Sequence, residues 1–237
     1  MEWLILLGLF AGALTTLAGL GGGMLMTLAL AALGSPSRAL AAAAPALLIG
    51  NAHRVALYRR ALDRSIWVPL VVGAAPGALV GALVAVSLPD SILRVLLVAG
   101  AALAVAKKLG WLPMLERTSR KYSAPVSFGA GVLTATSGGG GLLLGPLLLT
   151  MGVSGERFVA TASLVASSMH IARIVGYGAG GLVTQETLVE SAVLAASILA
   201  GNLLGKAFRP MLSDQGGQRL TYSVLLLCVA LSVLGLR

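Results

Sequence analysis

Two arginines occupy long apolar runs, where a charged side chain is expected to do chemistry. Arg54 lies in the run 38–58 and Arg173 in the run 158–180, and neither run contains an Asp or Glu. A charge inside a membrane span is costly, so it indicates a functional site. The planar fork of arginine suits a sulfonate, sulfite or carboxylate better than the ammonium group of lysine does. Arg54 lies about one turn from the end of its run and could instead extend to the lipid headgroups.

Two glycine clusters stand in similar apolar surroundings. They read "AGLGGGMLM" at 18–26 and "SGGGGLLLGP" at 137–146. Each glycine costs roughly 1 kcal/mol relative to alanine in a helix interior, so the clusters predict breaks in two helices. A half-helix that starts at a break presents free N–H groups and the positive end of its dipole, which together bind anions. The predicted backbone donors are Gly21, Gly22, Gly23, Gly139, Gly140 and Gly141.

Hydroxyl and imidazole side chains add to this predicted anion site. Ser137, Thr161 and Ser163 would contribute hydroxyl contacts, although hydroxyls in membrane helices also bond to their own backbone. His53 and His170 lie close to the two arginines in the sequence, and proton coupling is the role that histidine chemistry allows. Both histidines could instead lie at the membrane interface or form hydrogen bonds within the bundle.

Other chemistries lack the residues that they need. A dinucleotide loop requires an acid about 20 residues after the glycines, whereas the next acid after the first cluster is Asp63, and no Walker lysine follows either cluster. No paired carboxylates, metal-spaced His/Cys set or Ser/His/Asp arrangement is visible. The sequence therefore predicts no cofactor, no metal site and no enzymatic activity.

The composition is that of a protein embedded in lipid. The 237 residues are 57% hydrophobic and 11% charged, whereas a soluble domain carries about 25% charged residues. The chain therefore cannot cover a water-facing surface with polar groups. Its net charge of +9 lies mostly in short loops without interleaved aromatics, so nucleic acid is not an expected partner.

Eight apolar runs are long enough to cross a bilayer, which requires about 20 apolar residues. They do not alternate as β-barrel strands do, so the predicted fold is an all-α integral membrane protein. The first and fifth runs are too long for one straight span, and both contain a glycine cluster. The predicted segments are 3–33, 38–58, 66–88, 91–109, 124–151, 158–180, 188–212 and 219–236.

Basic residues predict which loops face the cytoplasm. Basic groups follow the second and the fourth run, so both loops are expected on the cytoplasmic side, and eight simple spans would put both termini there too. The loop after the sixth run instead carries Glu186 and Glu190, and the loop after the seventh carries Lys206, Arg209 and Arg219. This pattern disagrees with two parallel halves, whereas a re-entrant first segment in each half would make them inverted; the sequence leaves both arrangements open. The two basic groups are Arg59, Arg60 and Arg64, and Lys107, Lys108, Arg117, Arg120 and Lys121.

The chain repeats itself. "GALTTLAGLGGG" at 12–23 matches "GVLTATSGGGG" at 131–141 with one residue of slippage, and Arg54 then falls on Arg173. Internal repeats, with interrupted segments at matching positions, are typical of secondary transporters. The predicted organisation is a first membrane repeat at 1–110, a basic cytoplasmic linker at 111–123 and a second membrane repeat at 124–237.

These motifs resemble those of the sulfite exporter TauE/SafE family of bacterial membrane proteins, over essentially the whole chain. The resemblance rests on "GALTTLAGLGGGML", "GVLTATSGGGGLLLGPLLL", "RFVATASL" and "ALYRRALD". It implies a transporter of sulfur-containing anions in the cell membrane. The first half departs from the family pattern, because "AAAAPALL" stands in place of the Thr-Ser element and Thr27-Leu28 in place of a proline. The first-half site is therefore expected to be less polar than the second.

The functional expectation is export of sulfite, or a related sulfonate or oxyanion, by alternating access between the two repeats across the inner membrane. An anion channel, or a carrier of another small organic anion, would use the same residues. A non-transporting scaffold would use the glycines only to pack helices. The sequence is compatible with a homodimer but marks no interface for one.

Overall fold

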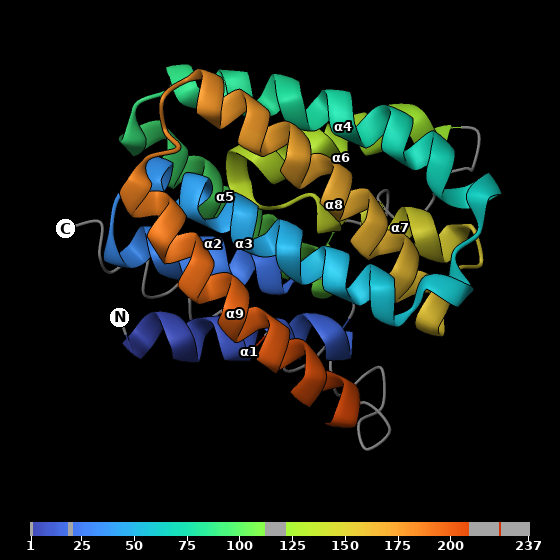
Figure 1. Ribbon diagram of the computed structural model, residues 1–237. Helices are drawn as coiled ribbons and strands as arrows, with labels where there is room; N and C mark the ends of the chain where they lie inside the picture. Colours follow the sequence, from blue (N-terminus) through green and yellow to red (C-terminus); the bar gives the residue numbers. More distant parts are fainter. Residues whose placement is uncertain (1, 19–20, 112–121, 209–222, 224–237) are drawn as a thin grey trace.

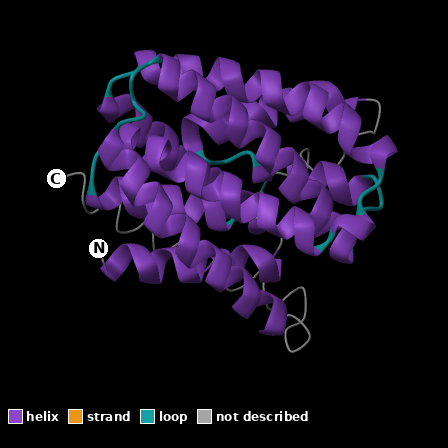
Figure 2. Cartoon of the chain, viewed as in Figure 1, coloured by secondary structure: helices purple, strands orange, loops and turns teal. Residues whose placement is uncertain are grey.

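The chain is helical wherever its structure is described. The computed structural model describes residues 2–18, 21–111, 122–208 and 223. These residues contain helices joined by short loops, with no strand (Figure 2). The all-α prediction is therefore confirmed for this part of the chain. The last predicted segment, 219–236, and the end of the one before it lie outside the described residues, apart from residue 223.

Both halves begin with a broken helix followed by long helices (Figure 1). In the first half these are α1 (Glu2–Ala18), α2 (Gly22–Leu33), α3 (Pro36–Leu57), the short 3-10 helix η1 (Arg59–Ala61), α4 (Arg64–Ser87) and α5 (Asp90–Lys108). In the second half they are α6 (Ser123–Ser137), α7 (Gly141–Thr150), α8 (Gly155–Ala179) and α9 (Gln185–Phe208). Four of them, α3, α4, α8 and α9, are long and apolar enough to cross a membrane. With 22 residues, α3 is about 33 Å long.

Local sequence explains where these helices start and stop. The hydroxyl of Ser35 accepts a hydrogen bond from the amide of Arg38 and so caps α3, whose first residue is Pro36; proline is favoured there because its missing N–H is not needed. At the breaks, Gly21 has φ 105° before α2 and Gly138 has φ 69° after α6. Residues other than glycine rarely adopt such values. The predicted breaks at both glycine clusters are confirmed.

The first helix of each half packs against the second membrane-length helix of the other half, α9 for the first half and α4 for the second. Gly12 of α1 leaves no room for a side chain against the carbonyl oxygen of Ile198 in α9. Gly131 of α6 meets the carbonyl oxygen of Ala74 in α4 in the same way. Such small residues let helix backbones approach closely in a membrane. The two matched contacts show that the halves are built alike and interlock.

Contacts across the bundle show that the two repeats are inverted. On α3, Leu40 contacts Arg173 and Arg54 contacts Ser163, so α3 and α8 run in opposite directions. The contacts of α1 and of α3 with α9 follow the sequence in the same order on both helices, so these three run parallel. By the same criterion α4, α6 and α8 run parallel to one another. The helices α1, α3 and α4 are therefore antiparallel to their counterparts α6, α8 and α9 (Figure 1).

The N-terminus does not lie on the side of the basic loops, where eight simple spans would have put it. The chain turns back between α1 and α2, so α1 begins at the same end of the bundle as α3 (Figure 1). The basic loop after α3 lies at the opposite end. The arrangement of eight simple spans fails because the run 3–33 forms two helices, α1 and α2, and not one span. The prediction for the C-terminus falls outside the described residues.

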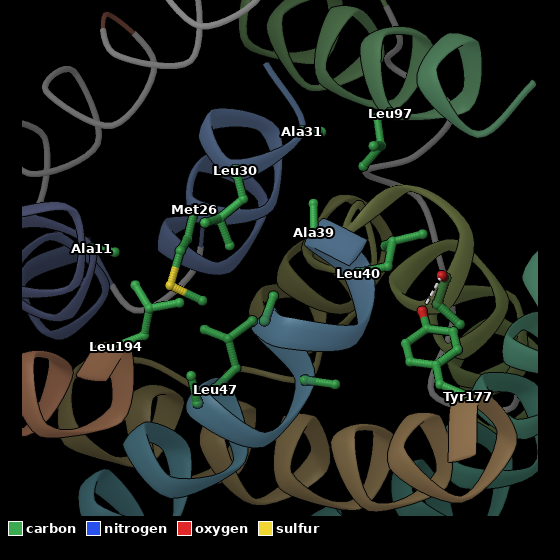
Figure 3. Packing of buried hydrophobic residues seen from close by; sticks show 14 of the residues in the cluster. Ala11, Met26, Leu30, Ala31, Ala39, Leu40, Leu47, Leu97, Tyr177 and Leu194 are labelled. Atoms are coloured by element: carbon green, nitrogen blue, oxygen red, sulfur yellow. Dashed lines mark hydrogen bonds between the residues drawn. The ribbon is translucent and has the colours of Figure 1, made fainter. Parts of the chain in front are cut away.

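The core between the long helices is rich in alanine and leucine. Met26 and Leu30 of α2 meet Leu47 of α3 and Leu194 of α9 in one buried cluster (Figure 3). The first half of α3 contains a run of buried alanines, Ala41 to Ala44. Because these side chains are small, α3 can lie close to its neighbours α8 and α9. The resulting α3–α8 pair positions both buried arginines.

Candidate anion-binding site

The antiparallel pair α3 and α8 directs two guanidinium groups towards the middle of the protein. A helical side chain leans towards the N-terminus of its own helix. Arg54 is near the C-terminal end of α3 and Arg173 near that of α8, so both side chains lean inwards from opposite ends. Only 2% of Arg54 and 0% of Arg173 is exposed. The alternative in which Arg54 extends to the lipid headgroups is therefore not what the structure shows.

Arg54 is surrounded by neutral oxygen atoms. Its Nε donates to the hydroxyl of Ser163 at 3.1 Å, and its Nη1 donates to Oδ1 of Asn202 at 2.9 Å. Its Nη2 donates to Oδ1 of Asn51 at 2.6 Å. These partners come from α8, α9 and α3, so three helices meet at this guanidinium.

Asn202 links the Arg54 cluster to the first broken helix. Its Oδ1 also accepts a hydrogen bond from the hydroxyl of Thr16 at 3.0 Å, near the end of α1. Its Nδ2 donates to the carbonyl oxygen of Gly50 at 2.9 Å and lies 3.3 Å from Nδ1 of His53. The predicted residues Arg54, Ser163 and His53 are therefore brought together.

Arg173 is held by different groups. Its Nε donates to the hydroxyl of Tyr177 at 3.2 Å, its Nη1 lies 3.0 Å from Nδ1 of His170, and its Nη2 donates to the carbonyl oxygen of Leu40 at 3.3 Å. The Tyr177 hydroxyl in turn donates to the carbonyl oxygen of Ala135 in α6 at 2.5 Å, the dashed bond in Figure 3. The guanidinium carbon also lies 5.4 Å from the centre of the Tyr177 ring.

Neither buried arginine is paired with a carboxylate of the described residues. The ion pairs in this part of the chain join Arg38 to Glu186 and Glu190, and Arg157 to Asp63. All involve exposed arginines at the ends of helices. Two buried positive charges are thus held by neutral groups, an arrangement that is costly without a compensating anion.

The glycine clusters shape the turns between half-helices. A side chain on Gly22 would collide with the hydroxyl of Thr15, and one on Gly140 with the hydroxyl of Thr134. Both threonines donate one turn back along their own helices, to the carbonyl oxygens of Ala11 and Ala130 respectively. Glycine is therefore required by the same contact in both repeats. Since Thr15 matches Thr134 and Gly22 matches Gly140, the one-residue slippage in the sequence match falls between these two positions.

The two breaks lie close to each other. Gly138 packs against Met24 in the first turn of α2, and Met24 shares a buried cluster with Leu142 in the first turn of α7. The starts of the two half-helices thus meet, as the anion-site prediction requires. No hydrogen bond between described residues joins the glycine amides to either guanidinium.

The predicted hydroxyls differ in what they are free to do. Ser137 donates to the carbonyl oxygen of Leu133 on its own helix at 2.9 Å. The hydroxyl of Thr161 is buried and has no hydrogen-bond partner among the described residues. It lies two residues before Ser163 on α8, so the two side chains point to different sides of that helix. A buried hydroxyl without a partner costs about 1–3 kcal/mol, so Thr161 is available to a ligand.

A pocket opens at the basic end of the bundle, near Arg54. It has a volume of about 300 Å³ and is lined by Ala56, Leu57, Tyr58, Arg59, Arg60, Ala61 and Glu156. Tyr58 is one helical turn beyond Arg54 and is 5% exposed. The pocket therefore ends next to the turn that carries the buried charge. No group of three or more His, Cys, Asp or Glu in the described residues is arranged to hold a metal ion.

Four residues of the two clusters were not among the predicted site residues. Asn202, Asn51 and Thr16 surround Arg54, and Tyr177 holds Arg173. Asn202 had a signal in the sequence, because an amide in the apolar stretch "LAGNLLG" needs a buried partner. Its partner could not be read from the sequence, since Arg54 lies 148 positions away.

Two inverted helical repeats, each with a broken first helix and a buried cation, define a membrane protein of the secondary-transporter class. The chain belongs to the sulfite exporter TauE/SafE family, whose model matches residues 4–233. It is therefore a member of a family of membrane transporters. Searches of the curated proteins and of the solved structures found no match.

Proposed function

We propose that this protein exports a small sulfur-containing anion, sulfite or a related sulfonate or oxyanion, across the inner membrane. The observation that carries the proposal is the pair of buried guanidinium groups, Arg54 and Arg173, with no carboxylate partner among the described residues. Two uncompensated cations attract an anion strongly in a medium of low dielectric constant. Family membership supports sulfite as the first substrate to test.

Sulfite suits the groups around Arg54. Its oxygen atoms can accept two parallel hydrogen bonds from one guanidinium, the strongest geometry for such a pair. The hydroxyl of Ser163 lies on the facing helix and would donate to a further oxygen, and Thr161 of the same helix offers a second buried hydroxyl. The amides of Gly21–Gly23 and Gly139–Gly141 would act on the anion where the half-helices start.

The pocket near Tyr58 is the proposed entrance. Arg59 and Arg60 line it, and positive charge at a pocket raises the local concentration of anions. Basic loops face the cytoplasm, so this end of the bundle is the cytoplasmic end and export would begin there. The anion would pass Tyr58 to reach Arg54.

Inverted repeats supply a mechanism for alternating access, because each repeat can adopt the conformation of the other. The anion would pass from the Arg54 half of the site to the Arg173 half as the opening moves across the membrane. Coupling to protons through His53 and His170 belongs to the same proposal. Nδ1 of His170 lies 3.0 Å from Nη1 of Arg173, and Nδ1 of His53 lies 3.3 Å from Nδ2 of Asn202.

The test is binding followed by flux. Purified protein in detergent is heated with sulfite, sulfate, thiosulfate, sulfoacetate, taurine or chloride, because a ligand that binds only the folded state raises Tm. We expect the largest rise with sulfite and its loss in Arg54→Gln. Proteoliposomes loaded with sulfite should then show saturable efflux that is accelerated by external sulfite. Fast, non-saturating flux without such exchange would indicate a channel, and no binding of any anion would reject the proposal.

A further inference from the structure

We propose that Asn202 is a positioning residue that holds Arg54 without neutralising it, so that the guanidinium keeps a free charge for the anion. The proposal rests on the proposed function and gives a role to a residue outside the site predicted from the sequence. Asn202 is on α9 and is completely buried. It is the contact through which α9 reaches the charge on α3.

Both ends of the Asn202 amide are engaged, which fixes its orientation. Nδ2 donates to the carbonyl oxygen of Gly50 at 2.9 Å. A carbonyl oxygen can only accept, so the NH₂ group must face Gly50 and the amide oxygen must face the other way. That oxygen accepts from Arg54 at 2.9 Å and from the hydroxyl of Thr16 at 3.0 Å. The guanidinium is thereby held by α1 and α9 together.

The chemistry of the amide matters as much as its position. Asn202, Asn51 and Ser163 satisfy N–H groups of Arg54 with neutral oxygens. A carboxylate in any of these places would form an internal ion pair and would compete with the substrate for the guanidinium. A neutral oxygen can be replaced by an oxyanion, which makes a stronger, charge-assisted bond. The neutral oxygens therefore stabilise Arg54 while the site is empty, and an oxyanion can replace them when it binds.

The first repeat has no equivalent of Asn202. Gly201 and Gly77 occupy matched packing positions, against Leu9 and Phe128 respectively, so the counterpart of Asn202 is Ala78. Ala78 is buried in an apolar cluster. The amide is therefore present in the Arg54 cluster alone, and it is not explained by the general architecture of the repeats.

The experiment compares Asn202→Asp with Asn202→Ala by sulfite-dependent Tm of the full chain in detergent. The aspartate should pair with Arg54, so we expect sulfite affinity to fall at least a hundredfold while the protein remains folded. The alanine removes one hydrogen bond to a charged group and should weaken sulfite binding by about tenfold. Ser197→Ala is the matched control, because Ser197 is a buried residue of α9 that bonds only its own helix, at Val193. It should leave sulfite affinity unchanged.

A loss in Asn202→Ala as large as that in Asn202→Asp would overturn the proposal, since charge would then be irrelevant. Should the aspartate variant fail to fold, Asn51→Asp places a carboxylate at another Arg54 donor, 2.6 Å away in the wild type. The same loss of sulfite binding is expected there. A folded Asn51→Asp protein with wild-type affinity would also overturn the proposal.

Failure of the proposed function can be separated from failure of this role. If the wild type responds to no anion, the transport proposal fails, and Asn202 is judged from ligand-free Tm alone. Asn202→Asp should then be better tolerated beside Arg54 than in an Arg54→Gln background, because only the former offers an ion pair. An equal change in both backgrounds would show that Asn202 does not act on Arg54.

Discussion

The Arg54 and Arg173 clusters occupy matched places in two inverted repeats, yet they hold their charges differently. In both, the guanidinium contacts the residue three positions earlier, Asn51 or His170. Arg54 otherwise bonds to side chains of other helices, Ser163 and Asn202. Arg173 bonds instead to a backbone carbonyl and to Tyr177, which is itself tied to the backbone of α6.

The two repeats therefore share the position of a buried arginine but not the groups that bond to its guanidinium. Side-chain oxygens can rotate away when a ligand arrives, whereas a backbone carbonyl within a helix cannot. The comparison therefore predicts that changes around Arg54 alter ligand binding more than stability. Changes around Arg173 should alter stability at least as much as binding. It also corrects the expectation that the first-half site is less polar, because Asn202 and Ser163 of the second half complete it.

The largest expected effect tests what the two repeats share. Gly22→Ala and Gly140→Ala each place a methyl group against a threonine hydroxyl that is bonded to its own helix. Both should lower stability by about 3 kcal/mol, since such packed sites relax poorly. Tm in detergent without ligand measures this. Gly178→Ala, where a side chain would meet nothing within 4 Å, is the control, and a harmless change at only one of the two sites would contradict the matched contact.

The next effect separates the two arginines. Arg54→Gln should abolish the sulfite-induced rise in Tm and change ligand-free Tm only modestly, because its neutral partners can bond to one another or to the glutamine. Arg173→Gln should lower ligand-free stability by about 2–3 kcal/mol, because Tyr177 and the carbonyl of Leu40 lose a charged donor. Sulfite binding should weaken in this variant as well.

The result that would contradict this comparison is the reverse order. If the protein unfolds in Arg54→Gln but stays folded in Arg173→Gln, Arg54 and not Arg173 is the arginine that stabilises the fold. Measuring both variants at several sulfite concentrations separates loss of affinity from loss of folded protein.

A smaller effect is expected at Thr161. Thr161→Val replaces a buried hydroxyl that has no hydrogen-bond partner in the described part of the chain by a methyl group of similar size. Ligand-free Tm should stay the same or rise, whereas sulfite affinity should fall about threefold to tenfold, as for the loss of one hydrogen bond. Ser167→Ala, which removes a hydroxyl that bonds back along its own helix at Ser163, serves as the comparison. A Thr161→Val protein with unchanged affinity would remove Thr161 from the site.

The smallest effect is expected at a matched pair on the surface. Arg38 and Arg157 stand at the starts of α3 and α8, and each pairs with an acid at the start of a neighbouring helix. Exposed ion pairs contribute little to stability. Arg38→Gln and Arg157→Gln should therefore leave Tm and sulfite affinity close to the wild-type values. A large loss of transport with unchanged binding would show instead that these pairs take part in opening and closing.

Sequence alone determined the features that depend on local composition. The apolar runs, the two helix breaks, the internal repeat and the lack of acids beside Arg54 and Arg173 follow from hydropathy, the helix propensity of glycine and the charges themselves. The inverted arrangement was open, because it depends on whether the chain crosses or turns back at each break. Only the tertiary structure decided that, and with it the end of the bundle at which the N-terminus lies.

The candidate site divides in the same way. Its charges could be found from the sequence, because an arginine in an apolar run is conspicuous wherever it lies. Its neutral partners could not, because Asn202 and Ser163 become neighbours of Arg54 only when α9 and α8 pack against α3. Hydrogen bonds between helices depend on distances of about 3 Å, and no spacing along the chain encodes them. The sequence thus placed two charges in a membrane, and folding decided which neutral oxygens surround each.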